Sequence, residues 1–195
     1  MHPSLTDNTL LFLLLQMILQ FACSKAGFVL YHLDPTVTDP EAAQTSLSQA
    51  LHATNANVLI AQEAGNDTNY IRLAERIIPE LRFFDYASGM PFVTPHYPHL
   101  RFCIHTGFDQ EDKWGWLPYR HMMVPSNNLE QYIPQRPQDT TPLAGTFTVG
   151  KDGIVVGLGK VLTQQDVLAQ PDVWPSYTKV LQREFHTVEG VGVVF

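Results

Sequence analysis

Four side chains of types that can bind a metal lie close together between positions 96 and 105. His96, His99, Cys103 and His105 have His-x-x-His and Cys-x-His spacings, which can place nitrogen and sulfur ligands around zinc. Prolines beside the first two histidines make their backbone irregular, while Cys103 and His105 share one face of an expected buried strand. We therefore favour packed or hydrogen-bonded core side chains over a metal site, and we expect no bound metal or other cofactor.

An acidic segment and an aromatic segment follow this cluster. The carboxylates of Asp109–Asp112 are of a type that does acid–base work, but the sequence places no nucleophile beside them, which favours a solvated loop. Trp114, Trp116 and Tyr119 come next. We interpret these three aromatic residues as candidate anchors of a protein interface, because aromatic side chains often dominate binding energy. Core packing is an equally good interpretation of the same residues.

The composition limits the class of protein. Hydrophobic residues make up 45% of the 195 residues, which is enough for a buried core. Charged residues make up 16%, against about 25% in a typical soluble domain, as expected when a partner covers part of the surface. The net charge of −7 argues against nucleic-acid binding, which needs clustered Lys and Arg. Cys23 and Cys103 fall in apolar patterns and are expected to be buried free thiols, with a disulfide as the alternative.

Helical and strand patterns alternate along the first half of the chain. We expect helices from Thr6 to about Lys25, from Pro40 onwards, and from Thr68 or Asn69 onwards. We expect strands at Phe28–Leu33, Ala56–Ala61, Leu81–Tyr86 and Leu100–His105. This order predicts an α/β fold with a partial, mostly parallel sheet flanked by helices.

The composition of the sequence changes after Pro118, where several prolines are spread through a polar stretch. The sequence predicts two parts, an α/β domain over residues 1–118 and a Pro-rich, irregular, extended arm over residues 119–195. Within the arm we expect a hairpin turning at Lys151–Gly153, a short helix capped by Thr163, and another starting at Pro175.

The apolar segment Leu10–Phe21 is the strongest candidate for membrane contact. It is about 12 residues long, whereas a membrane-spanning helix needs about 20. We interpret it as a buried core helix, and peripheral contact with a membrane is the less favoured alternative.

The segment FACSKAGFVLYHLDP, Phe21–Pro35, resembles the adenylate-forming acyl-CoA synthetases, in which a helix, a strand and an Asn-Pro or Asp-Pro turn follow one another. Ser48–Leu51, Asn57–Ile60 and Asn69–Glu80 fall in the order and spacing of the next elements of that family. The resemblance covers about Leu10 to His105. It implies a scaffold region of the family's N-terminal subdomain, which holds no catalytic residue.

The catalytic motifs of that family have no counterpart in this chain. Its Thr/Ser/Gly-rich ATP-binding loop is missing, and Gly150–Lys160 lacks both its hydroxyl residues and the spacing of a P-loop. The family's ribose-binding aspartate and C-terminal catalytic lysine are missing as well. We therefore expect that the chain is not an enzyme on its own.

Three hypotheses for function remain. The first is a non-catalytic accessory or structural subunit of a larger, membrane-associated complex, in contact with other protein subunits. The resemblance suggests a mitochondrial location, with the cytoplasm as the alternative. The second hypothesis is one part of a split or truncated acyl-CoA synthetase that adenylates a fatty acid and forms a thioester. The third is a standalone module that binds an acyl chain or lipid.

Overall fold

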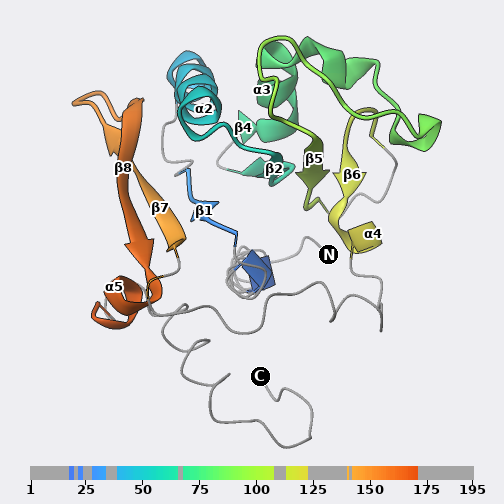
Figure 1. The fold of residues 1–195 in the computed structure, drawn as a ribbon. Helices are drawn as coiled ribbons and strands as arrows, with labels where there is room; N and C mark the ends of the chain where they lie inside the picture. Colours follow the sequence, from blue (N-terminus) through green and yellow to red (C-terminus); the bar gives the residue numbers. More distant parts are fainter. Residues whose placement is uncertain are drawn as a thin grey trace, which may run out of the picture. The chain divides into compact units, whose positions relative to one another are not determined.

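The computed structural model describes residues 18–19, 22–23, 28–33, 39–65, 68–107, 113–122, 140 and 142–170 of the chain. They form an α/β fold, as the sequence predicts, and Figure 1 shows their elements. Residues 18–19 and 22–23 are helical, within the first expected helix. The rest of that helix, the acidic segment and the helix expected at Pro175 lie outside the described residues. No helix among the described residues is long and apolar enough to cross a membrane.

The chain forms two compact units, each built from separate stretches of sequence. One comprises residues 33–126 and 147–159, and the other comprises residues 1–32, 127–146 and 160–195. The expected division near Pro118 is a single cut along the chain, whereas these units are interleaved along it.

The helix α2, Pro40–Thr54, begins and ends where local signals place it. The Asp39 side chain accepts a hydrogen bond from the Ala42 amide, and Pro40 occupies the first turn, where its missing N–H is not needed. Asn55 ends the helix in the left-handed conformation with φ 51°. The prediction of a helix opening at Pro40 is confirmed.

A parallel sheet belongs to the unit of residues 33–126 and 147–159. Its strands are β2, Val58–Ala61, β5, Phe102–His105, and β6, Leu117–Pro118, in the order β2-β5-β6 (Figure 1). Both pairings are parallel, and the strands predicted near Ala56–Ala61 and Leu100–His105 are confirmed. After β6 the chain continues directly into the short helix α4, Tyr119–Met122.

The connection from β2 to β5 contains several short elements. A small antiparallel hairpin, β3 (Ala64–Gly65) and β4 (Thr68–Asn69), leads into α3, Tyr70–Ile77. The Asn69 side chain accepts a hydrogen bond from the Arg72 amide, which confirms the predicted helix start.

The strand predicted at Leu81–Tyr86 is wrong. This region forms two 3₁₀ helices, η1 at Pro79–Arg82 and η2 at Tyr86–Ser88. Pro79 sets a helical φ at the first position of η1, and the Asp85 side chain accepts a hydrogen bond from Ala87 N at the start of η2. These two local signals outweigh the aromatic composition that favoured a strand.

The main core of this unit joins α2, α3, the 3₁₀ segment and the sheet. Its buried members are Leu51, Ile71, Ala74, Ile78, Leu81, Phe92, Tyr97, Leu100, Cys103 and Trp116. Cys103 is a buried free thiol, as expected, whereas Cys23 is free but only half-buried.

A second sheet contains β1, Leu30–Tyr31, with β7, Pro142–Val149, and β8, Val155–Thr163. Its order is β1-β7-β8, and β1 pairs with β7 in parallel, so among the described strands β1 does not join the sheet of β2. The predicted hairpin is confirmed with longer strands, and Gly153 has φ 79° in its turn. The helix α5, Gln164–Leu168, starts at a capping box formed by Thr163 and Asp166.

Candidate functional site

The four metal-ligand candidates are divided between the surface and the core. His96 and His99 are exposed on the loop before β5, whereas Cys103 and His105 are buried within β5. Burial raises the pKa of the Cys103 thiol, so that in the absence of a metal the thiol stays in its neutral, weakly nucleophilic form. Among the described residues, no three His, Cys, Asp or Glu side chains are arranged to hold a metal ion.

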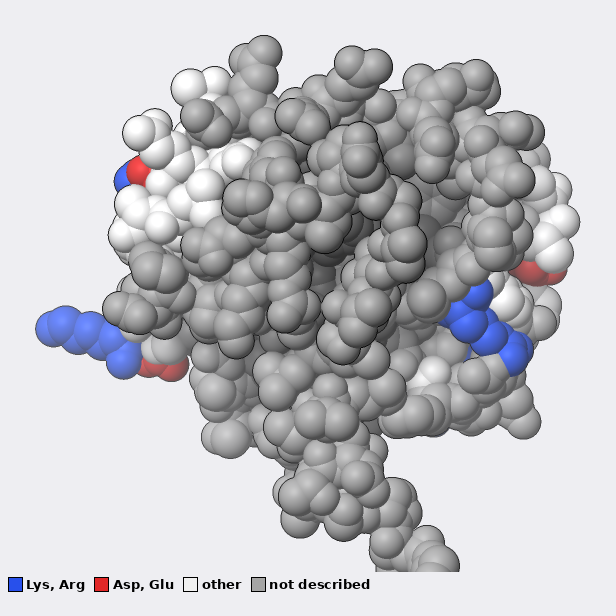
Figure 2. Space-filling model, turned by 90° about the horizontal axis from the view of Figure 1, so that it is seen from below, with Lys and Arg blue, Asp and Glu red and all other residues white. Residues whose placement is uncertain are grey.

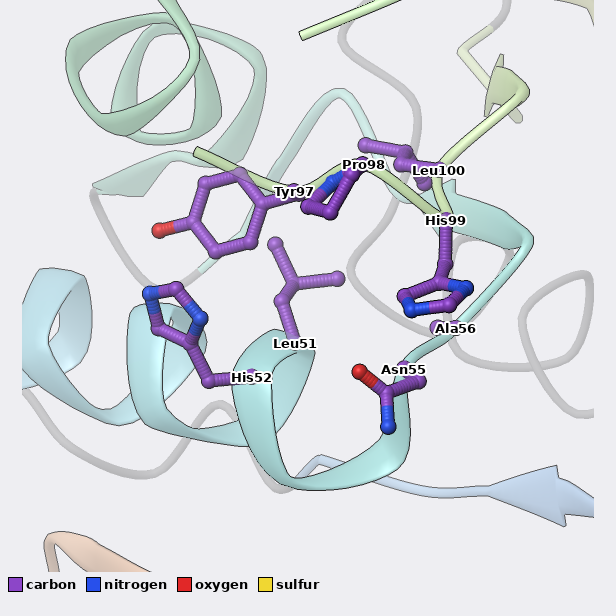
Figure 3. A pocket seen from close by; sticks show the side chains of 8 residues that line it. All are labelled: Leu51, His52, Asn55, Ala56, Tyr97, Pro98, His99 and Leu100. Atoms are coloured by element: carbon purple, nitrogen blue, oxygen red, sulfur yellow. The ribbon is translucent and has the colours of Figure 1, made fainter. Parts of the chain in front are cut away.

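A small cavity lies between the last turn of α2 and the loop before β5 (Figure 3). The rings of His52 and Tyr97 lie 4.7 Å apart on one side, and Tyr97 Oη is 2.9 Å from Ser48 Oγ. His99 also lines the cavity, and its carbonyl oxygen accepts a hydrogen bond from Asn57 Nδ2 at 3.0 Å. The cavity volume is about 20 Å³, room for about one water, whereas ligand pockets measure on the order of 300–1,000 Å³. It is too small for a substrate or an acyl chain.

The aromatic segment forms a tight turn that is fastened to the 3₁₀ segment. Trp116 N donates to the Lys113 carbonyl oxygen at 3.0 Å, and Gly115 N donates to the Phe84 carbonyl oxygen at 2.7 Å. Gly115 has φ 70°, and a Cβ there would lie 2.6 Å from Leu81 Cα. Only glycine combines this left-handed conformation with so close an approach to a neighbouring backbone. Residues 113–116 and 81–84 are therefore adjoining segments.

These adjoining segments each carry a large exposed aromatic side chain. Trp114 is 64% exposed and Phe83 is 82% exposed, whereas Trp116 is 2% exposed and belongs to the core. Tyr119 is half-buried in α4. Of the three predicted interface residues, the structure thus makes Trp114 the exposed one. We call Phe83 and Trp114 together the aromatic surface.

An ion pair also holds the Trp114 segment in place at Lys113. Lys113 Nζ lies 2.7 Å from Glu63 Oε1, and the Glu63 backbone carbonyl accepts a hydrogen bond from Tyr70 N. A Cβ at Gly107 would collide with the Glu63 side chain, so glycine at this position makes room for the ion pair. The two aromatic side chains therefore project from a fixed framework, which lowers the entropy lost when a partner binds.

The sequence alone did not point to Phe83. Its neighbours suggested a strand, in which Phe83 would have alternated with inward-facing residues. The signal that was available is Pro79, which favours a helical turn, so that Leu81 turns inward to the core and Phe83 outward.

A second apolar patch lies at the start of the parallel sheet. Val58 and Phe102 are register partners on β2 and β5, and they are 43% and 48% exposed. The Tyr86 ring stacks on Phe102 with centroids 6.3 Å apart, and burial is the main reason that the pKa of Tyr86 rises to about 12. Tyr86 Oη accepts a hydrogen bond from Cys103 N at 2.9 Å, so this tyrosine has a structural role.

The charges of the described residues do not form a continuous basic surface on the face in Figure 2. Lys and Arg appear there as small separate groups, some beside carboxylates. One exposed ion pair joins Lys160 Nζ to Asp166 Oδ1 at 3.1 Å. Hydrogen bonds from Thr163 and Lys160 lower the pKa of Asp166 to about 2.

No protein-family model, curated protein or solved structure matches this chain.

Proposed function

We propose that this chain is a non-catalytic accessory subunit of a larger assembly, and that it binds another protein subunit through the aromatic surface. The observation that carries this proposal is the exposure of Phe83 and Trp114 on adjoining segments fixed by Gly115. Neither side chain contributes to the core, so neither is needed to explain folding.

The expected gain in free energy from covering these two side chains is substantial. Aromatic residues bury about 150–250 Å² each when fully covered, at about 25 cal/mol per Å². Truncation of such an anchor at an interface typically costs about 2 kcal/mol or more in binding free energy. Two anchors on a rigid framework are therefore sufficient to dominate one interface.

The rest of the proposal concerns the setting of the subunit. The resemblance to acyl-CoA synthetases suggests that the scaffold descends from that family without its chemistry. It also suggests a mitochondrial location, since fatty-acid-activating members of the family are found there. The apolar segment Leu10–Phe21 is the reason for proposing a membrane-associated complex. The cavity beside α2 is too small for an acyl substrate, so it does not support acyl binding.

The test is native isolation through a tag on the full chain, with mass spectrometry of the co-purifying proteins and the mass of the particle. We expect one or more stoichiometric partners with the wild-type chain, and their loss with Phe83→Ala/Trp114→Ala. The matched control is Phe102→Ala, which removes a comparably apolar exposed aromatic side chain from the second patch.

Three results would contradict the proposal. Recovery of the wild-type chain as a monomer would show that it does not belong to a stable assembly. Recovery with a protein that carries the missing phosphate-binding loop would favour a split synthetase. Equal loss of partners with the Phe102→Ala control would assign the interface to another surface.

A further inference from the structure

We propose that the partner segment on the aromatic surface is basic, with a Lys or Arg side chain placed over Trp114 or Phe83. This inference rests on the proposed protein-binding function and specifies the chemistry of the partner. Its basis is the balance of charges on the segments that carry the two aromatic residues.

Both basic side chains on these segments are already ion-paired. Lys113 Nζ contacts Glu63 Oε1 at 2.7 Å, and Arg82 Nε lies 3.8 Å from Glu75 Oε2. Each of these cations is therefore partly neutralised by a carboxylate of this chain, which weakens its attraction for an acidic partner.

Two further carboxylates, one on each side of residues 81–84, lack a basic partner among the described residues. Glu80 lies in η1, three positions before Phe83, and side chains with this spacing are aligned on a 3₁₀ helix. Its Oε2 atom is buried, and no described residue donates a hydrogen bond to it. Asp85 is exposed two residues after Phe83. Glu80 is half-buried as a whole, so its carboxylate and that of Asp85 add negative charge beside Phe83 that favours a cationic partner.

The aromatic rings themselves add to the preference for a cation. Arg and Lys are attracted to the face of Trp or Phe by the ring quadrupole, and the attraction strengthens when a partner excludes water. A guanidinium over Trp114 or Phe83 would combine this attraction with that of Glu80 and Asp85. An acidic segment would meet the same two carboxylates as like charges and be repelled.

The same charge balance disfavours an anionic lipid surface as the occupant. Binding to anionic lipid is driven by Lys and Arg near the apolar side chains. Here the two nearby cations are paired, and the chain as a whole carries a net charge of −7.

The test uses the full-length chain and a 12-residue synthetic peptide of alternating Arg and Leu, titrated by isothermal calorimetry at low salt. We expect Phe83→Ala/Trp114→Ala to weaken binding at least tenfold. We expect Glu80→Gln/Asp85→Asn to weaken it about tenfold, while Asn at position 85 keeps the cap of η2. The matched control is Glu41→Gln/Asp152→Asn, which removes two carboxylates from other elements and should change affinity less than twofold.

Two comparison ligands complete the experiment. A peptide with Glu in place of Arg and vesicles containing phosphatidylserine should both fail to bind. The inference is overturned if either binds as well as the Arg peptide, or if the control variant weakens binding as much as Glu80→Gln/Asp85→Asn. Native isolation with the carboxylate variant separates the two proposals. If this variant retains the partners that Phe83→Ala/Trp114→Ala loses, the aromatic surface still binds a protein, but the inference that the partner is basic is wrong.

Discussion

Gly115 shows how one residue determines the form of the aromatic surface. It has φ 70°, and a Cβ at this position would lie 2.6 Å from Leu81 Cα and 2.7 Å from Leu81 C. We expect Gly115→Ala to lower the free energy of unfolding by more than the about 1–3 kcal/mol typical of backbone strain alone, because steric overlap adds to it. Chemical denaturation measures this loss.

Gly89 provides the matched control for that substitution. It has φ 69°, but a Cβ there would have no neighbour within 4 Å. Gly89→Ala should therefore lower stability only by the backbone strain. Equal losses for the two variants would mean that the contact between Gly115 and Leu81 contributes nothing.

At this scale, short polar caps were predictable and the aromatic surface was only half predictable. The caps at Asp39, Asn69 and Thr163 depend on residues within three positions, so the sequence shows them directly. The exposure of Trp114 depends on which of two nearby tryptophans reaches a core assembled from distant segments, and no local pattern distinguishes it from Trp116.

At the scale of elements, one buried hydrogen bond joins the helix α2 to the β7–β8 hairpin. Ser46 is 3% exposed, and its Oγ accepts a hydrogen bond from Val155 N at 2.8 Å. We expect Ser46→Ala to cost about 1–3 kcal/mol, because a buried N–H loses its acceptor. Hydrogen exchange at the Val155 amide should become faster, and denaturation should show the lower stability.

The neighbouring residue Thr45 gives the control for this element. Its Oγ1 donates to the Glu41 carbonyl oxygen within the same exposed helical turn. Thr45→Ala should change stability by no more than about 0.5 kcal/mol. If Ser46→Ala leaves exchange at Val155 unchanged, the hydrogen bond between helix and hairpin does not exist in solution.

At the scale of the whole molecule, the main core and the β7–β8 hairpin come from different parts of the sequence. The core cluster around Trp116 draws only on residues from Leu47 to Trp116. The strand β1 instead relies on β7, which begins at Pro142. We therefore expect a fragment of residues 1–122 to keep slow hydrogen exchange in β5 and to lose it at Leu30 and Tyr31. Protection at Leu30 and Tyr31 equal to that in the full chain would contradict this expectation.

The alternation of helices and strands was enough to predict the α/β class, but not the partner of each strand. The sequence suggested one partial sheet that includes Phe28–Leu33. In the structure β1 and β2 join different sheets, because β7 supplies the neighbour of β1. Strand pairing between distant segments depends on packing in three dimensions, so the local spacing of apolar and polar residues does not reveal it.

The pairing of Leu30 with Ala144 also has a consequence for biosynthesis. The two residues are separated by more than a hundred positions, so β1 leaves the ribosome long before its partner strand is made. At synthesis rates of about 5–20 residues per second, the delay is roughly 5–25 s. During that time α2 and the parallel sheet can fold, while β1 still lacks its partner β7 and is open to association with chaperones or other nascent chains.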